Sequence, residues 1–306
     1  MLGYRDDGVV LRTQKLGEAD RIITLLTRQN GRVRAVAKGV RRTKSRFGGR
    51  LEPFTHVDVM IHPGRSLDVI TQAEVIRPYG APLAGDYPRY TAGTAMLETA
   101  ERFTPVEKEP ALRQFLLLIG GLRALGETGE DAKEPRLVLD AYLLRSLAVA
   151  GYAPALEECA RCGAPGTPAP IRSAATATAP SEATAPEPSP APEATTPEPS
   201  TSANEGSGPQ PPQDEFSEAH TSPRGRRLVA FAVAAGGMVC ASCRPPGAAS
   251  PSAQTVALML ALLRGDWEHA MRTERRHRVE CSGLVAAYLQ WHLEHSIRSL
   301  RHVERA

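Results

Sequence analysis

The chain lacks any long apolar segment. No stretch of its 306 residues approaches the roughly 20 consecutive apolar residues of a membrane-spanning helix. Its first residues, Met1 to Asp7, also lack an apolar run followed by a cleavage site, so we expect no export signal. The sequence therefore predicts a soluble, cytoplasmic protein with no membrane partner.

The chain also lacks the local motifs of common catalytic sites. It contains neither a GxxxxGK[ST] phosphate-binding loop nor an HExxH metal-binding helix. No nucleophile with an adjacent base and no group of converging carboxylates can be recognised from residue order. We therefore expect a protein that is not an enzyme.

Carboxylates are missing from one long segment, residues 21–51, between Asp20 and Glu52. Solvated surfaces usually mix charges of both signs, so this exclusion favours contact with a polyanion. A basic surface kept only for solubility is the alternative. The cations of the segment are Arg21, Arg28, Arg32, Arg34, Lys38, Arg41, Arg42, Lys44, Arg46 and Arg50.

The basic segment has two parts. Over residues 32–38, a period of two sends small apolar residues to one face and Arg32, Arg34 and Lys38 to the other, which predicts cations on an exposed sheet face. Over residues 38–50 there is little to bury, which is typical of a flexible, phosphate-contacting loop, with Phe47 as its one candidate for base stacking. Together the two parts would form a groove for single-stranded nucleic acid.

The first 80 residues contain five short runs rich in Val, Ile and Thr. Five such strands predict an OB-fold barrel, which commonly binds oligonucleotides, although a five-stranded SH3-like barrel would give the same pattern. The predicted strands are Gly8–Thr13, Ile22–Thr27, Arg32–Lys38, Val57–Ile61 and Leu67–Val75.

From Gly85 onward the apolar period becomes helical. We therefore expect an α+β protein: an OB-fold domain over residues 1–80, then an all-helical domain in two parts, 81–163 and 225–306. The predicted helical segments begin at Tyr90 and then cover Leu112–Leu125, Leu137–Val149, Val256–Leu263 and Leu284–Leu300.

Residues 164–224 lack Leu, Val, Met, Trp and Tyr, so they cannot offset the entropy of ordering, and we expect a disordered insertion. The insertion contains eight carboxylates and two arginines. Without it, 35 cations and 26 anions give a net charge of +9, against +3 for the whole chain. The remainder is therefore distinctly basic, as expected of a protein that binds a polyanion.

Two cysteine pairs flank the insertion, Cys159 with Cys162 and Cys240 with Cys243. Each has the two-residue spacing with which two thiolates bind one zinc ion. The 77 residues between the pairs exceed the spacing of a compact zinc ribbon, but the longer loop adds only ~1.2 kcal/mol of closure entropy. Zinc bound by four thiolates has no open position, so the metal would be structural. Two disulfides or a redox pair are the alternatives, and Cys281 is expected in the core.

The order and spacing of several segments resemble the bacterial RecO family of recombination mediators. The resemblance covers nearly all of the chain outside the insertion, and the insertion itself departs from the family pattern. The matching segments are Gly8–Arg12, Gly17–Thr24, Gly31–Gly39, Arg42–Phe47, Leu51–Phe54, Thr71–Glu74, Ala150–Pro154 and Gly236–Cys240.

The resemblance implies an N-terminal OB-fold that binds single- and double-stranded DNA, a helical domain with a zinc site, and no catalysis. It also implies annealing of strands coated by the single-strand-binding protein, and RecA loading with RecR and RecF. A zinc-ribbon factor that binds RNA or assists transcription is the alternative. Carried over by position, the DNA-binding residues would be Arg32, Arg34, Lys38, Arg41, Arg42, Lys44 and Arg46, and the zinc ligands Cys159, Cys162, Cys240 and Cys243.

Overall fold

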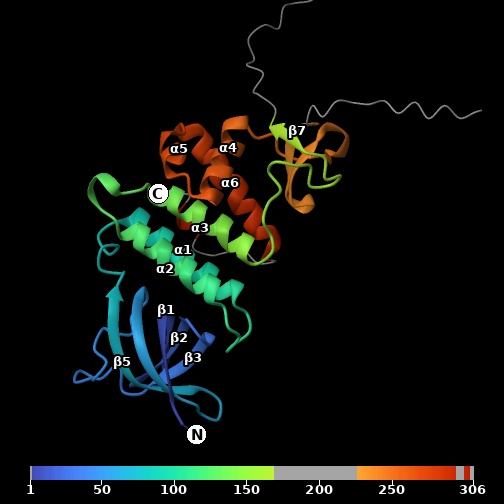
Figure 1. Ribbon diagram of the computed structural model, residues 1–306. Helices are drawn as coiled ribbons and strands as arrows, with labels where there is room; N and C mark the ends of the chain where they lie inside the picture. Colours follow the sequence, from blue (N-terminus) through green and yellow to red (C-terminus); the bar gives the residue numbers. More distant parts are fainter. Residues whose placement is uncertain (1, 169–225, 294–299, 304–306) are drawn as a thin grey trace, which may run out of the picture. The chain divides into compact units, whose positions relative to one another are not determined.

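The N-terminal segment forms a closed five-stranded barrel in the computed structural model (Figure 1). The strands are paired in the order β1-β2-β3-β5-β4, and β4 closes the barrel against β1. Only the β3–β5 pair is parallel. This is the strand order of the OB-fold, so that prediction is confirmed over the SH3-like alternative. The strands are β1 (Tyr4–Leu16), β2 (Asp20–Thr27), β3 (Gly31–Ala37), β4 (Thr55–His62) and β5 (Asp68–Pro78).

The structure describes residues 2–168, 226–293 and 300–303. Nearly all of the predicted insertion 164–224 lies outside the described residues. The predicted boundary at residue 80 falls in the connection between β5, which ends at Pro78, and the first helix, which begins at Tyr87.

Helices make up most of the second part of the chain. Each predicted helical segment is found, except for residues 294–299, which lie outside the description. α5 was not predicted. α6 begins nine residues earlier than expected, and its start was missed because its first turns are mostly charged and show no apolar period. The helices are α1 (Tyr87–Phe103), α2 (Leu112–Gly126), α3 (Pro135–Val149), α4 (Ala253–Arg264), α5 (Trp267–Arg272), α6 (Arg275–His292) and α7 (Leu300–Val303). None of the described helices is long and apolar enough to cross a membrane.

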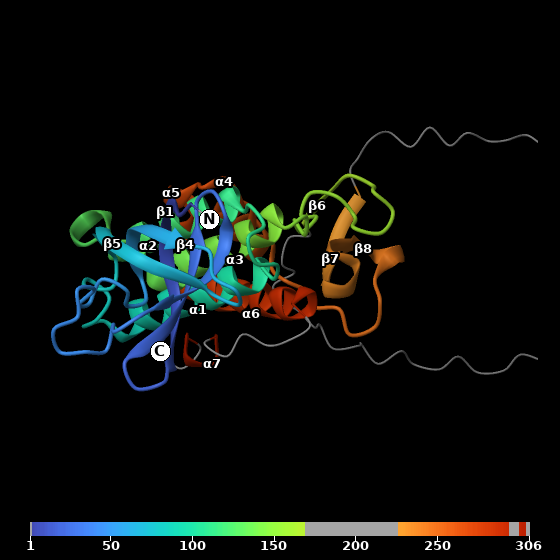
Figure 2. The ribbon, with the colours of Figure 1, turned by 90° about the horizontal axis from the view of Figure 1, so that it is seen from below.

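A small three-stranded sheet interrupts the helices. Its order is β6-β7-β8, with β6 parallel and β8 antiparallel to β7. Figures 1 and 2 show this sheet on the far side of the helices from the barrel. Its strands are β6 (Gly166–Pro168), β7 (Arg226–Ala232) and β8 (Gly237–Cys240), and short 3-10 turns cover Gly129–Asp131, Val233–Ala235 and Ala241–Cys243.

Two apolar cores meet along β1. Val10 points into the barrel and packs with Ile23 and Leu25. Its neighbours Val9 and Leu11 point outward and belong to the core that continues through the helices. All of these side chains are 0–5% exposed, so the middle of β1 is buried on both faces. The barrel and the helices therefore form one compact unit.

The connection between α1 and α2 lies against the start of β3. The backbone N–H of Lys108 donates to the carbonyl of Arg32 at 2.8 Å. The Lys108 ammonium also lies 2.9 Å from Asp68 at the start of β5, and the Asp68 side chain is only 4% exposed. At Gly31 the approach is so close that a Cβ atom would lie 1.7 Å from the carbonyl oxygen of Glu109.

We expect Gly31→Ala to destabilise the protein more than Gly48→Ala. Both glycines have positive φ, 62° and 51°, so each alanine costs about 1–2 kcal/mol in backbone strain. Gly48 has open space around it, whereas Gly31 meets Glu109, which should cost about 1–3 kcal/mol more. Urea unfolding of both variants measures the difference, and equal losses would contradict the close contact.

Asp140 is a buried carboxyl at the contact between α3 and α6. It is 3% exposed and accepts a hydrogen bond of 2.5 Å from the Ser282 hydroxyl. Arg136 donates to the same hydroxyl at 2.8 Å. Burial raises the pKa of Asp140 to about 7, against the weaker opposing effects of Ser282 and Arg136. The folded protein therefore keeps a proton on Asp140 that the unfolded chain would release.

This proton should make stability depend on pH. Because the pKa of Asp140 is raised in the folded protein, its contribution to the free energy of unfolding is fully present below about pH 4. This contribution is lost as the pH rises to about 7. The total is up to ~4 kcal/mol. Asp140→Asn should remove this slope, which urea unfolding of both proteins at pH 4.5 and 7.5 would measure. An identical slope in the variant would show that Asp140 titrates normally.

Candidate nucleic-acid interface and metal centre

Three apolar anchors hold the basic segment between β3 and β4. Val40, Phe47 and Leu51 are 9%, 1% and 1% exposed and pack into the barrel core. The expectation of a loop with little to bury is therefore wrong. Phe47 is also unavailable for stacking with a base, because its ring lies in the core beneath the Arg46 guanidinium, 4.9 Å from the ring centre.

Polar contacts fix the same segment to the β1–β2 turn. Asp20 accepts a hydrogen bond from the backbone N–H of Gly39 at 2.7 Å. Arg41 donates from its side chain to the carbonyl of Glu18 at 2.8 Å, and its backbone N–H donates to Ala19 at 2.9 Å. Arg41 is thus partly engaged in holding the loop in place.

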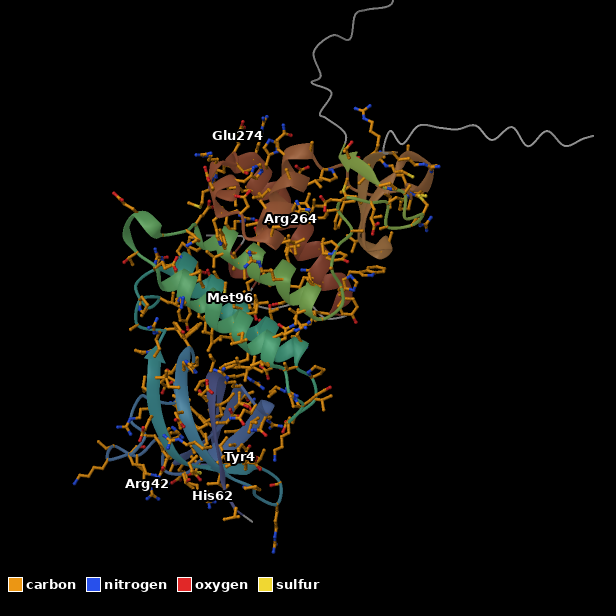
Figure 3. The ribbon with its side chains drawn as sticks, viewed as in Figure 1. Tyr4, Arg42, His62, Met96, Arg264 and Glu274 are labelled. Carbon is orange, nitrogen blue, oxygen red and sulfur yellow. The ribbon has the colours of Figure 1, made fainter. Side chains whose placement is uncertain are left out.

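Four other cations of the loop point outward. Lys38, Arg42, Lys44 and Arg46 are all exposed, and Figure 3 labels Arg42 on the barrel. Within the described part of the chain, none of these four side chains has a carboxylate partner. The anchored loop therefore presents unpaired positive charge to solvent, as a phosphate-binding surface requires.

Arg32 and Arg34 have a different environment. Alternation along β3 is as predicted from Arg32 to Ala35, with Val33 and Ala35 buried inside the barrel, but Val36, on the same face as the arginines, is only 8% exposed. However, the Arg32 side chain is only 16% exposed, lies 4.0 Å from Glu101 and donates to the Pro105 carbonyl.

Arg34 lies 3.3 Å from Glu107, and its side chain is 34% exposed. The expected exposed basic sheet face is therefore corrected at both arginines, because α1 and the segment after it cover them. Glu101 and Glu107 were missed from the sequence, since nothing in the helical pattern indicates which strand a helix will meet.

The four cysteines come together. Their sulfur atoms all lie within 4.8 Å of one another, although 77 residues separate the two pairs. Four sulfurs at about 2.3 Å from one metal ion would be about 3.8 Å apart, so the group needs little adjustment to bind one. All five cysteines are free thiols. Cys281 is fully buried in α6, away from the cluster, as expected of a core residue.

Parallel pairing of β6 with β7 closes the gap between the pairs. The backbone N–H of Arg226 donates to Pro165 at 2.9 Å, and Gly166 lies opposite Arg226 in the register. β8 then ends at Cys240, whose N–H donates to the Cys159 sulfur at 3.5 Å. The two ends of the insertion are thus held side by side next to the cluster.

Local hydrogen bonds favour the thiolate form of Cys240 and Cys159 and the neutral thiol form of Cys243. The Ser242 hydroxyl, 3.2 Å from the sulfur of Cys240, lowers the pKa of that thiol to about 6. Burial opposes ionisation of Cys159, yet backbone N–H groups of Cys240, Cys162 and Arg161 bring its pKa below the usual value. The hydrogen bond to Cys240, together with burial, raises the pKa of Cys243 to about 12.

Four adjacent thiolates repel one another, and a divalent cation would remove that repulsion. Arg226 supplies part of the compensating charge, because it donates to Cys240 and the nearby thiolates raise its pKa. The donor set therefore fits a thiophilic metal with no open coordination position.

Comparisons with known proteins find the same family in both halves of the chain. The family model "Recombination protein O N terminal" matches residues 1–79, and "Recombination protein O C terminal" matches 84–193 and 213–301. Proteins named "DNA repair protein RecO" are similar throughout: 58% identity over 303 residues in Thermobifida fusca, 52% over 308 in Streptomyces griseus and 50% over 303 in Frankia casuarinae. Each match covers 99% of this chain and 99% of the relative.

The fold and the site define an OB-fold protein whose helical part contains a possible four-cysteine metal centre. The chain belongs to the RecO family of DNA repair proteins. The resemblance predicted from the sequence is thereby confirmed, and the role of the chain lies in DNA repair and recombination. Family membership favours this role over the RNA-binding or transcription-associated alternative.

We expect the chain to bind one divalent metal ion and Cys162→Ser to lose it. Cys162 is exposed, so this change removes a ligand without disturbing the core. Cobalt(II) substitution measures the result, since thiolate-to-cobalt absorption reports the number of sulfur ligands. Cys281→Ala is the matched control and should retain the metal. Full metal content and unchanged absorption in the Cys162 variant would contradict a four-cysteine site.

Proposed function

We propose that the chain is a recombination mediator that binds single- and double-stranded DNA and anneals complementary strands coated by the single-strand-binding protein. The observation that supports this best is the anchored loop over residues 38–50, in which Lys38, Arg42, Lys44 and Arg46 are exposed and have no carboxylate partner among residues 2–168, 226–293 and 300–303. Such cations neutralise phosphates and release counterions, so binding is indifferent to sequence and weakens as salt rises.

Annealing follows from the same electrostatics. Two strands approach each other when their phosphates are screened and their base edges remain free. A loop that contacts only the backbone leaves those edges available for pairing. Arg32, Arg34 and Arg41 belong to the same proposed DNA-binding set, with contributions reduced by their internal contacts.

The partners in this proposal are those that membership of the RecO family implies. The protein acts with RecR and RecF to promote RecA loading on DNA covered by the single-strand-binding protein, in the cytoplasm at the nucleoid. The four-cysteine cluster holds one structural zinc ion, because zinc prefers four sulfur ligands in a tetrahedron. Cys159, Cys162, Cys240 and Cys243 are its ligands. The ion stabilises the helical part and takes no direct part in annealing.

The combined change Arg42→Ala, Lys44→Ala and Arg46→Ala should weaken DNA binding. Loss of up to three phosphate contacts lowers the slope of log affinity against log salt by up to about 2 for single strands. Fluorescence anisotropy across a salt series measures this slope. The same variant should anneal complementary oligonucleotides, precoated with single-strand-binding protein, more slowly than the unaltered chain.

A matched control removes three other arginines, Arg264, Arg272 and Arg276. Their side chains are 62%, 79% and 69% exposed on the helical part, so the net charge falls equally. This control should keep both affinity and slope. Equal losses of DNA affinity in the two variants would show that the loop acts only through the net charge of the protein. Unchanged binding in the loop variant would show that the loop is not part of the DNA interface.

A further inference from the structure

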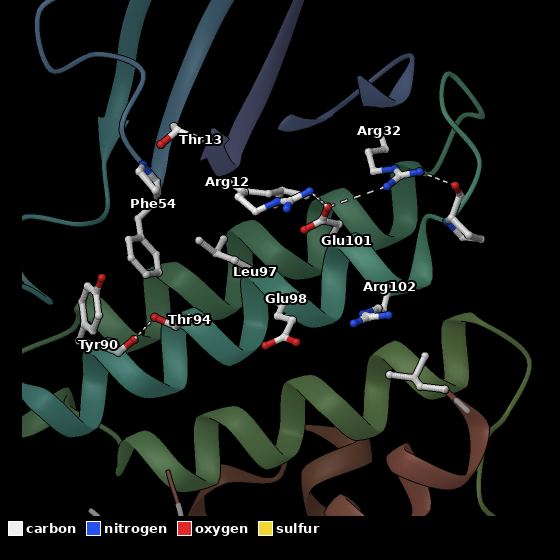
Figure 4. A pocket seen from close by; sticks show the side chains of 14 residues that line it. Arg12, Thr13, Arg32, Phe54, Tyr90, Thr94, Leu97, Glu98, Glu101 and Arg102 are labelled. Atoms are coloured by element: carbon white, nitrogen blue, oxygen red, sulfur yellow. Dashed lines mark hydrogen bonds and ion pairs between the residues drawn. The ribbon is translucent and has the colours of Figure 1, made fainter. Parts of the chain in front are cut away.

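A cleft lies between the barrel and α1, with a volume of about 790 Å³ (Figure 4). Clefts of roughly 300–1,000 Å³ accommodate ligands of small-molecule size, a range that includes a nucleotide. The barrel side is formed by Arg12, Thr13 and Phe54, and the helix side by Tyr90, Thr94 and Arg102, among others. Both aromatic and cationic side chains therefore face one hollow.

Tyr90 is the exposed aromatic residue of this cleft. It is 48% exposed, while Phe54 next to it is 4% exposed. The two rings meet at an interplanar angle of 60° with their centres 5.5 Å apart. Phe54 thus supports Tyr90 from the barrel side, and half of the tyrosine remains accessible. A supported, half-exposed aromatic ring is the element on which proteins stack unpaired bases.

Arginines stand further along the same cleft. Arg12 lies 2.9 Å from Glu101, and its side chain is 46% exposed. Arg102 is exposed on α1, and within the described residues it has no carboxylate partner. Glu98 and Glu101 also line the cleft. These carboxylates disfavour a phosphate directly beside them, and they can accept hydrogen bonds from base amino groups.

The cleft and the basic loop share backbone segments. The connection between β3 and β4 contains the exposed cations and ends at Pro53 and Phe54, which line the cleft. Arg41 of the loop contacts the β1–β2 turn, and β1 itself contributes Arg12 and Thr13 to the cleft. The loop and the cleft are therefore linked through β1 and through the connection between β3 and β4.

We propose that this cleft binds an unpaired nucleotide of single-stranded DNA, with its base stacked on Tyr90 and its phosphate toward Arg102. The inference rests on the proposed function and specifies where single strands bind differently from duplexes. In a duplex, each base face is covered by its neighbours and cannot stack on a protein side chain. The loop therefore binds both forms of DNA, and the cleft binds only the single-stranded form.

Tyr90→Ala should weaken binding of an oligothymidylate by roughly five- to 150-fold, the effect of removing one stacked base. Binding of a duplex of the same length should not change. Fluorescence anisotropy with both probes measures the ratio of the two affinities. Tyr90→Phe keeps the ring and should restore the ratio of the unaltered chain.

Tyr87→Ala is the matched control, because Tyr87 is 56% exposed on the same helix and does not line the cleft. It should bind both probes normally. Unchanged oligothymidylate binding in Tyr90→Ala would overturn the proposal, as would equal losses for both probes, which would indicate a disturbed fold. The loop variant tests the proposed function separately. If the loop variant binds DNA normally while Tyr90→Ala loses affinity for single strands, the result supports nucleotide binding in the cleft and contradicts DNA binding by the loop.

Discussion

Burial of the middle of β1 on both of its faces determines how the helices pack against the barrel. Val10 fills the barrel, while Val9 and Leu11 continue into the helical core. This double burial fixes α1 against the barrel and places Glu101 beside Arg12. It also turns one side of the barrel from a free surface into the wall of a cleft. An OB-fold without this helical cover would expose Arg32 and Arg34 as well.

The basic loop shows how burial can position charge. Val40, Phe47 and Leu51 reach the barrel core, so the backbone between them is fixed and Lys38, Arg42, Lys44 and Arg46 remain exposed to solvent. Burying these cations without partners would cost several kcal/mol each. The loop therefore combines a stable position with a surface of unpaired positive charge. This arrangement is suited to binding a nucleic-acid strand without regard to its base sequence.

The cysteine cluster joins two parts of one folded unit that a long insertion separates in the sequence. Closing a longer loop costs free energy only with the logarithm of its length. The β6–β7 pairing and four convergent sulfurs hold its two ends together. The sheet around the cluster packs into the same core as α6, through contacts such as Phe231 with Tyr288. The cysteine cluster and the packing of the helices therefore support each other.

The strands of the barrel, most of the helices, the four-cysteine set and the family could be predicted from residue order, because periodicity, CxxC spacing and motif order are local or ordered along the chain. The accessibility of Arg32, Arg34 and Phe47 could not. Their environments depend on residues far away in the chain, such as Glu101 and Glu107, and on depth within the barrel. Residue type specifies what a side chain can do, but its neighbours across the fold determine whether it remains free to do it.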